Sequence, residues 1–349
     1  MENQKILSII IPTYNMEKYL PKCLDSLISA KEVLCKMEIL IINDGSKDAS
    51  SRIAHEYQSR YPDSIIVIDK ENGNYGSCVN RGLKEATGKY IKVLDADDWF
   101  LTQNLKRYID VLAAQDVDLV LTDFDTITPN GKVINKVRYD YPKNVVLDIE
   151  RYCGKQEFMK MQMHAVTYRT SMLKNIGYHQ SEGISYTDVE WIFEPMSYVK
   201  SFCYTGITIY QYLIGREGQT MDPSQMNKHI EHTLKGMYAI LDAYMRRVSE
   251  CGEGMRQYMQ AKINIRLGSL YSRSLLKPYL DMETIIKLDN YIKEKDMNVY
   301  RTSDNIVIHK LLPLCYVRYW RSHGKKELPS WMKIIYDILL RINKVIKKY

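Results

Sequence analysis

The sequence has no paired cysteines and no long apolar run. None of its seven cysteines belongs to a C-x-x-C pair, which argues against a disulfide framework and a zinc site and indicates reduced thiols in a cytoplasmic protein. The early apolar run, Ile6 to Ile11, is interrupted by Ser8 and is too short for a signal peptide. No later run approaches the ~20 apolar residues that span a bilayer. We therefore expect a cytoplasmic protein, either free or held peripherally at the inner face of the membrane.

Two common phosphate-binding loops are also missing. There is no G-x-x-x-x-G-K-[ST] segment, which excludes a P-loop. The stretch "NGNYGSCVNRG", residues 72–82, lacks the G-x-G-x-x-G spacing and does not follow the first predicted strand, which argues against a dinucleotide-binding fold. A phosphatase with paired aspartates would carry them on the first strand, whereas here they follow the fourth.

What is present is an ordinary globular composition with an uneven charge. The 349 residues are 45% hydrophobic and 26% charged, with a net charge of +7. Residues 225–349 carry 23 Lys and Arg against 12 Asp and Glu, whereas the rest of the chain is slightly acidic. We predict two parts, residues 1–220 and 221–349, that have different partners. No recognised binding motif accompanies the basic part, so we expect no nucleic acid partner.

Strand and helix patterns alternate in the first third of the chain. Five runs rich in Ile, Val and Leu alternate with helical patterns of about 12 residues, which predicts parallel β-α-β units and an α/β fold. The strands are expected at residues 5–12, 37–44, 64–70, 89–98 and 116–124. A hairpin is expected around Asn130 and Gly131, then short strands mixed with helices to about 214, and helices from about 224 onward.

Four of these strands end in polar segments. They are followed by Pro12–Asn15, Asn43–Ser46, Lys70–Asn74 and Asp95–Asp98. In a parallel α/β sheet, ligands bind beyond the carboxyl ends of the strands, so we expect these segments to form one site.

The fourth segment, "DADD", points to a cation. Asp95 and Asp97 lie two apart, so in an extended chain their side chains share one side, ~6–7 Å apart. Mg²⁺ or Mn²⁺ holds oxygen ligands at only ~2.1 Å and often shares them with phosphates. One aspartate could therefore bind the metal of a nucleotide diphosphate while the other reaches the ribose. The alternative is that the aspartates only cap the next helix.

The strand-end motifs together resemble a known family. "SIIIPTYN", "INDGSKDAS" and "ENGNYGSCVNRGLKEATGKYIKVLDADDW" are similar to the family 2 inverting nucleotide-sugar glycosyltransferases, over about residues 5–125 and more loosely to 220. The resemblance implies a GT-A fold, a mostly parallel sheet flanked by helices, here with a helical C-terminal region. It implies Mn²⁺- or Mg²⁺-dependent transfer of one sugar, expected from a UDP donor, to a saccharide or lipid-linked acceptor in surface polysaccharide synthesis.

The resemblance also assigns roles to residues. Asp97, or alternatively Asp95, would hold the metal. Arg216, in "YQYLIGREGQT", would clamp the leaving diphosphate, although a solvated surface arginine is an alternative. The nucleotide-sugar contacts would come from Pro12, Thr13, Tyr14, Asp44, Asn72, Asn74, Gly76, Arg81, Asp95, Ala96 and Arg216.

The general base would lie in "SEGISYTDVEWIF", residues 181–193. The family match gives Asp188, but Thr187 stands where the family has Glu, and Glu190 is the rival. Residues two apart in a helix face different directions, so only one should point into the site. The alternative is that both acids only stabilise the start of a helix.

The C-terminal segment, residues 328–349, is amphipathic. Basic residues lie beside its apolar stripe, which is typical of a helix lying on a membrane surface. The stripe consists of Trp331, Ile334, Ile335, Ile338, Leu339, Ile342 and Ile346. The alternative is a helix that packs on the protein or on a second subunit of a homo-oligomer.

The sequence is also compatible with other functions. The Q-x-x-R-W signature of processive synthases is absent, which favours single addition. A catalytically silent sugar-nucleotide-binding or scaffold protein remains an alternative because of Thr187. A sugar nucleotidyltransferase is a further alternative, although "PTYN" replaces its glycine-rich first loop. His164 could line the acceptor side, bind metal or simply be buried in the core.

Overall fold

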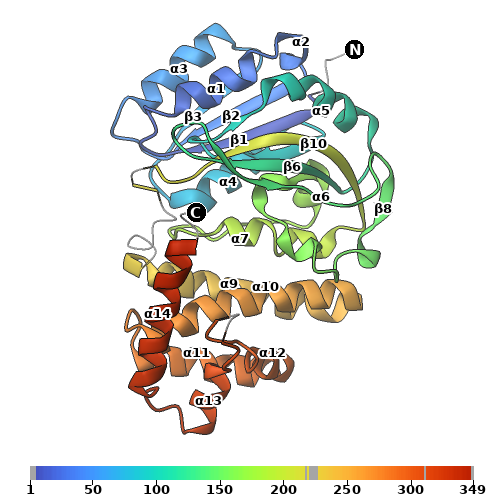
Figure 1. Ribbon diagram of the computed structural model, residues 1–349. Helices are drawn as coiled ribbons and strands as arrows, with labels where there is room; N and C mark the ends of the chain where they lie inside the picture. Colours follow the sequence, from blue (N-terminus) through green and yellow to red (C-terminus); the bar gives the residue numbers. More distant parts are fainter. Residues whose placement is uncertain (1–4, 217, 220–226, 310–311, 347–349) are drawn as a thin grey trace.

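A computed structural model describes residues 5–216, 218–219, 227–309 and 312–346. In this part of the chain one large sheet lies above a block of helices (Figure 1). The strand order is β3-β2-β1-β4-β9-β6-β10-β5, with β7 added beside β6 and β8 beside β10. The strands are β1 (Leu7–Thr13), β2 (Met37–Asn43), β3 (Ile65–Asp69), β4 (Tyr90–Val93), β5 (Trp99–Phe100), β6 (Leu119–Ile127), β7 (Val133–Val137), β8 (Val146–Asp148), β9 (Val166–Arg169) and β10 (Ser201–Leu213).

The half of the sheet formed by β3, β2, β1 and β4 is parallel. In register, Ile10 of β1 lies opposite Leu40 of β2 and Val93 of β4. Every residue of β2 is buried, as expected for a parallel strand that helices cover on both faces. The predicted α/β fold with a largely parallel sheet is confirmed.

Helices cover both faces of the sheet. The helices α1 (Leu20–Ile28), α2 (Lys31–Leu34), α3 (Ser50–Arg60) and α5 (Thr102–Ala114) lie on one face (Figure 1). On the other face lie α4 (Asn74–Glu85) and α6 (Thr170–Asn175), which contact each other. The polar segments after β1, β2, β3 and β4 therefore meet at one edge, between these two layers.

The prediction of short strands between residues 150 and 214 is only partly right. The strand β9 lies antiparallel between β4 and β6, and β10 is a 13-residue strand parallel to β6. The pairing of β10 with β6 shifts register between Tyr204 and Thr208, where Gly206 has a φ of +63°. This irregularity and the interspersed Thr and Gln residues conceal a single long strand in the sequence.

The predicted hairpin is confirmed. Strands β6 and β7 pair antiparallel on either side of a turn in which the Gly131 N–H donates to the carbonyl of Thr128. Gly131 has a φ of +82°, a conformation that glycine adopts at no steric cost.

The rest of the described chain is helical, as predicted. Its helices are α9 (Ile230–Arg247), α10 (Glu253–Tyr271), α11 (Met282–Lys295), α12 (Met297–Ser303), α13 (Tyr316–Ser322) and α14 (Ser330–Ile346). We call residues 227–346 the helical region. The predicted boundary between 220 and 221 falls within 220–226, outside the described residues, so the two-part division remains a prediction.

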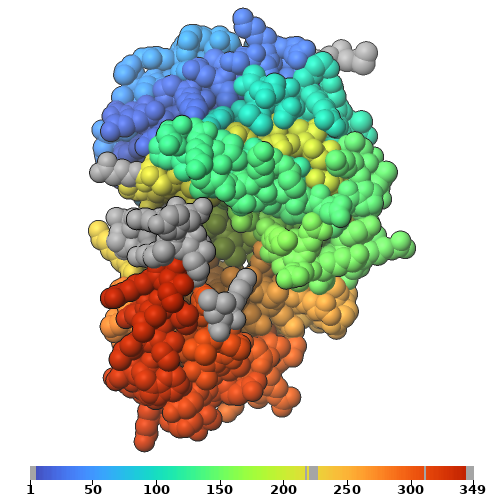
Figure 2. Space-filling model, viewed as in Figure 1, coloured from blue at the N-terminus to red at the C-terminus, as the bar shows by residue number. Residues whose placement is uncertain are grey.

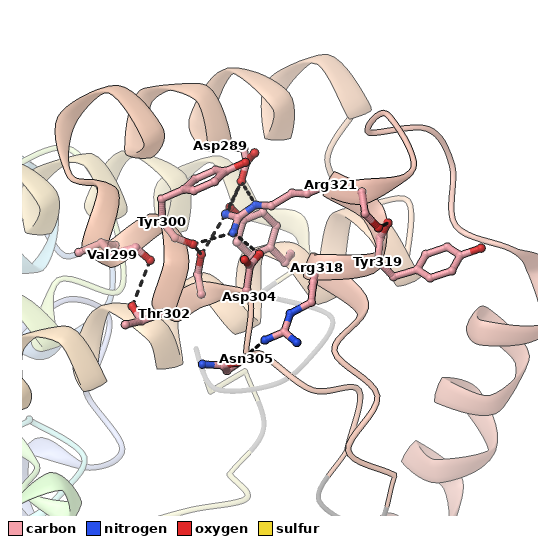
Figure 3. Close-up of polar contacts among 12 residues, drawn as sticks. Asp289, Val299, Tyr300, Thr302, Asp304, Asn305, Arg318, Tyr319 and Arg321 are labelled. Carbon is pink, nitrogen blue, oxygen red and sulfur yellow. Dashed lines mark hydrogen bonds and ion pairs between the residues drawn. The ribbon is translucent and has the colours of Figure 1, made fainter.

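A buried ion-pair network joins three helices of this region. Arg321 of α13 lies between Asp289 of α11 and Asp304, just after α12, with Arg321 nitrogens 2.6 and 2.8 Å from the two carboxylates (Figure 3). Tyr271, at the end of α10, also donates its hydroxyl to Asp289. A charge this deeply buried is tolerated when its hydrogen bonds are satisfied.

The last helix, α14, lies along the outside of the helical region (Figures 1 and 2). Of the predicted segment 328–349, residues 347–349 lie outside the described residues. Among the helices that the structure describes, none combines the length and the apolar character needed to cross a bilayer.

Candidate active site

A cavity of about 470 Å³ lies at the carboxyl ends of β1, β2 and β4. Eleven of the predicted site residues line it, namely Pro12, Thr13, Tyr14, Asp44, Asn72, Asn74, Asp95, Ala96, Asp97, Asp188 and Arg216. Segments that are more than 200 residues apart in the chain are thus brought to one place. Three other predicted residues, Gly76, Arg81 and Glu190, do not line this cavity.

Asp44 is held rigidly at the end of β2. Its carboxylate lies 2.5 Å from the Lys70 ammonium and accepts a hydrogen bond from the Gly73 N–H at 2.9 Å. The Asn72 side chain donates to the Asp44 carbonyl, and Gly45 follows with a φ of +71°. The segments after β2 and β3 therefore form one hydrogen-bonded wall of the cavity.

Each aspartate of the "DADD" segment has its own partner. Asp95 accepts a hydrogen bond from the Tyr75 hydroxyl at 2.9 Å, and Asp97 is ion-paired with Arg216. Asp98 is buried and accepts from the Tyr210 hydroxyl and the Leu213 N–H, both at 2.7 Å.

The alternative that these aspartates cap the next helix is wrong. The residue at the N-cap of α5 is Leu101, and no side chain caps that helix. Capping therefore does not explain why three carboxylates gather here.

These carboxylates lie in an environment that disfavours negative charge. Burial raises the pKa of Asp95, and the nearby Asp97 charge raises it further, while the Tyr75 hydrogen bond lowers it. Burial raises the pKa of Asp98 well above its usual range, with added contributions from Asp97 and Asp95. A cation bound here would relieve this repulsion.

The residues present fit a divalent metal. Ligand atoms of Asp95, Asp98 and His164 all lie within 4.8 Å of one another. His164 is buried against the ring of Tyr212, and its Nδ1 atom has no hydrogen-bond partner among the described residues. Burial, with a smaller contribution from Lys92, lowers the pKa of His164 to about 3, so its imidazole is neutral and can donate a lone pair. Of the two carboxylates, Asp95 is the one that lines the cavity.

Asp188 and Glu190 face different surroundings. Asp188 begins the short helix α7 (Asp188–Trp191) and lines the cavity, where burial raises its pKa. The Glu190 carboxylate instead accepts a hydrogen bond from the Ser181 N–H at 2.8 Å. Of the two candidate bases, Asp188 is the carboxylate that reaches the cavity. Its role as the base remains a prediction.

Thr187, where the resemblance leads us to expect a glutamate, is fully buried. The Gln180 side chain donates to both the carbonyl and the hydroxyl of Thr187, at 2.7 and 2.8 Å. Residue 187 thus fixes the shape of the segment that precedes Asp188.

Gly76 and Arg81 lie on α4, away from the cavity. Arg81 pairs with Glu85 on the same helix. Gly76 lies against the backbone of residue 181, and an added Cβ would be 2.0 Å from the Ser181 carbonyl oxygen. Gly76 therefore allows α4 to pack closely on the 180–183 segment.

The sequence reasoning missed a set of tyrosines. Tyr75 and Tyr210 donate to the aspartates, and Tyr212 stacks on His164. In "YQYL", Tyr210 and Tyr212 are two residues apart, so both side chains lie on one face of a strand. This spacing predicts that the two tyrosines act together, but only if residues 201–213 are assigned to a strand.

Comparison with known proteins identifies the relatives of this chain. The family model described as "Glycosyl transferase family 2" matches residues 8–177. An "uncharacterized glycosyltransferase MG060 homolog" of Mycoplasma pneumoniae is 30% identical over 227 residues, which cover 62% of this chain and 71% of the relative. The "uncharacterized glycosyltransferase MG025 homolog" of the same organism is 40% identical over 126 residues, 36% of this chain, and the match spans only 41% of its length.

Among solved structures, residues 1–349 of S. aureus TarS in complex with UDP-GlcNAc superpose with a TM-score of 0.58 at 18% identity. That match covers 85% of this chain and 90% of TarS 1–349. At this identity, the likeness shows the fold alone. The sheet order and the strand-end cavity define a GT-A fold. The chain belongs to glycosyltransferase family 2.

Proposed function

We propose that this chain is a metal-dependent, inverting glycosyltransferase that moves one sugar from a UDP-sugar to a saccharide or lipid-linked acceptor in surface polysaccharide synthesis. The observation that carries this proposal is a single cavity lined by a first group, Asp44, Asp95, Asp97 and Arg216, and also by Asp188. The first group suits a nucleotide diphosphate, and Asp188 suits a proton acceptor. The UDP-GlcNAc bound to TarS, which has the same fold, supports a UDP-sugar as the first donor to test.

The reaction is a single displacement at the anomeric carbon. An acceptor hydroxyl oxygen forms a bond to this carbon as the bond to the diphosphate oxygen breaks, and the diphosphate leaves with the electron pair. The Asp188 carboxylate accepts the hydroxyl proton. Arg216 holds the diphosphate and offsets part of its charge. Attack from the face opposite the leaving group inverts the configuration.

Asp97 and Asp95 would hold the metal on the cavity side, with His164 as a further candidate ligand. Bound there, the ion supplies positive charge to the leaving diphosphate. Arg216 is ion-paired with Asp97, and it would be released toward the diphosphate if Asp97 held the metal.

The test is a thermal-shift screen of UDP-, GDP-, dTDP- and CDP-sugars, each with and without Mn²⁺. A ligand that binds only the folded state raises the melting temperature. We expect a shift with UDP-sugars that depends on Mn²⁺, is lost in Asp97→Asn, and is kept in Asp110→Asn, which changes an exposed carboxylate on α5. The absence of any nucleotide-dependent shift in the wild type would contradict the proposal and leave a scaffold role.

We also propose that the enzyme is cytoplasmic and contacts an anionic lipid surface through α14. The apolar side chains of Trp331, Ile334, Ile338 and Ile342 are 41–58% exposed on this helix, whereas Met332 on its other side is fully buried. Residues 310–349 carry ten Lys and Arg against two Asp and Glu. An exposed apolar face beside excess positive charge is complementary to anionic lipid.

Vesicle sedimentation tests this contact. We expect binding to vesicles containing phosphatidylglycerol, weaker binding to pure phosphatidylcholine, and loss of binding in I334S/I338S. The control I134S removes an equally exposed isoleucine from β7 and should bind like the wild type. A concentration-dependent dimer that I334S/I338S abolishes, without vesicle binding, would assign this face to a second copy of the chain.

A further inference from the structure

The helical region reaches the segment that carries Asp188. The Ser185 N–H donates to Nδ1 of His232, on α9, at 3.1 Å. The guanidinium of Arg266, on α10, donates to the Tyr186 carbonyl at 3.2 Å. Residues 185–188 line the cavity, so two helices from the C-terminal half support one wall of the candidate active site.

The supported segment is strained at the point of contact. Tyr186 has a φ of +66°, which costs energy for a residue with a Cβ atom and persists only when its surroundings hold it. Arg266 holds the carbonyl of this same residue. We therefore expect that loss of Arg266 loosens residues 185–188.

The Arg266 side chain packs against a glycine of the neighbouring helix. Gly236 of α9 faces it, and a Cβ atom at that position would lie 2.7 Å from a guanidinium nitrogen. The same added Cβ would lie 3.8 Å from Glu190 Oε1, an atom without a hydrogen-bond partner among the described residues. Arg266 thus lies close to the acidic helix α7.

Arg266 is also the cation that acts most strongly on Asp188. Burial raises the pKa of Asp188, and the Arg266 charge lowers it. Among the described residues, the other ionisable groups whose pKa the Asp188 charge raises are Asp95, Tyr75, Tyr186 and Tyr212. These are acids or phenols, so none of them brings a positive charge.

We propose that Arg266 is a positioning residue for the transfer reaction: it fixes the strained Tyr186 turn and supplies the positive charge that keeps the Asp188 carboxylate ready to accept a proton. This inference rests on the proposed function, because it gives the C-terminal helices a part in the chemistry of that same cavity.

The test compares Arg266→Met and Arg266→Lys with Lys262→Met. Lys262 is a matched control, since it is another largely buried cation one turn earlier on α10, but its ammonium donates to the carbonyls of Met159 and Met161. The rate of Mn²⁺-dependent UDP release from the UDP-sugar found in the screen is measured between pH 5.5 and 9. Hydrogen exchange of the peptide covering residues 181–191 is measured in parallel.

In the pH–rate profile, the rate falls toward low pH as Asp188 takes up a proton, and we call this part the acid limb. We expect the acid limb of Arg266→Met to lie at higher pH, because removing a cation raises the pKa of a neighbouring carboxylate. If the acid limb is displaced by about one pH unit, the rate of UDP release falls about tenfold at pH values below the pKa of the base. At pH values well above this pKa, the rate is unchanged. Arg266→Lys should restore most of the limb, and Lys262→Met should leave it in place. Exchange of residues 181–191 should be faster in Arg266→Met only, with Mn²⁺–UDP still bound.

Three results would overturn the inference: an equal loss of rate at every pH, an acid limb displaced equally in Lys262→Met, or unchanged exchange in Arg266→Met. If Arg266→Met does not fold, Arg266→Gln replaces it, because glutamine keeps an N–H donor but has no charge. The pH–rate profile of Arg266→Gln must then show the displaced acid limb. A wild type that binds Mn²⁺–UDP but never releases UDP would instead contradict the proposed function, and the exchange measurement would still decide whether Arg266 holds the turn.

Discussion

At the scale of single residues, the candidate site depends on three neighbouring aspartates, each of which has a different side chain as its partner. Asp95, Asp97 and Asp98 are satisfied by Tyr75, Arg216 and Tyr210, each from a different element. The aspartates were visible in the sequence as a motif, whereas their partners were not. A tyrosine is recognisable as a partner only when its strand or helix has been placed.

Lys262 gives a prediction about pH. Burial lowers its pKa from 10.5 to about 8 in the folded protein, so between these values the unfolded chain binds more protons and stability rises with pH. The stability of the wild type relative to Lys262→Met should therefore increase as the pH is raised from 8 to 10, on the order of 1 kcal/mol per pH unit.

The measurement is urea unfolding of both proteins at several pH values. Groups other than Lys262 titrate equally in both and cancel in the difference. A difference in unfolding free energy that stays constant or falls with increasing pH would contradict this prediction.

At the scale of elements, the close contact between α4 and residues 180–183 connects the segment after β3 to the segment that leads to Asp188. The Asn80 side chain, on α4, exchanges hydrogen bonds with the backbone of Gln180, and the Gly183 N–H donates to the Gly73 carbonyl. Gln180 in turn holds Thr187, next to Asp188. The position of α4 thus influences the position of the predicted base.

Gly76→Ala tests this contact. The new methyl group would lie 2.0 Å from the Ser181 carbonyl oxygen, so the two segments must separate. We expect a loss of about 1–3 kcal/mol in unfolding free energy and reduced UDP release. The control is Gly268→Ala on α10, where the methyl would meet only Ile306 at 3.5 Å and should be neutral or stabilising. Equal unfolding free energies for the two variants would contradict the close contact.

The ion-pair network of Figure 3 should determine the stability of α11, α12 and α13. Arg321 is 7% exposed and Asp289 fully buried, so removing one partner leaves the other charge buried with a single remaining ion pair, Arg321 with Asp304 or Asp289 with Lys325. Because one ion pair remains, Asp289→Asn and Arg321→Met should each cost about 2–3 kcal/mol in unfolding free energy, less than the loss of a buried charge's last partner.

The double variant of this network should cost less than the sum of the single variants, because the two residues interact directly. Chemical unfolding of all four proteins measures this coupling. Strict additivity would show that the two residues stabilise the helical region independently.

The elements that could be predicted from the sequence are those with a local signal. The Ile- and Leu-rich runs of β1 and β2, the helices between the first strands and the Asn130–Gly131 turn all follow from nearby residues. The strand β10 could not be predicted in full, because it combines Thr, Gln and a glycine kink. Its burial comes from its neighbours β6 and β5, which the local sequence does not reveal.

At the scale of the whole molecule, the acidic and basic parts of the chain are less separate than the charge pattern suggests. The pattern predicted two parts with different partners, which remains a prediction; on α14, Arg341 and several apolar side chains are exposed. However, Arg266 belongs to the basic part and faces the carboxylates of the cavity. A count of charges along the chain does not show which cations fold back on the active site.

The choice between Asp188 and Glu190 also depends on the whole molecule and not on the local sequence. The family resemblance named it, and the sequence alone left Glu190 as a rival. The cavity distinguishes the two, because only Asp188 of the pair lines it. That distinction depends on α4, α9 and α10 together, which no local pattern describes.

The most direct test of the central claim is UDP release from a UDP-sugar, with and without Mn²⁺, by the wild type and Asp188→Asn. We predict Mn²⁺-dependent release by the wild type and a rate at least ~100-fold lower in Asp188→Asn, because the general base is lost. Asp188→Asn should still give the Mn²⁺-dependent thermal shift with UDP. Equal rates for the two proteins would contradict the role of Asp188, and no release by the wild type with any UDP-sugar would contradict the proposed transferase activity.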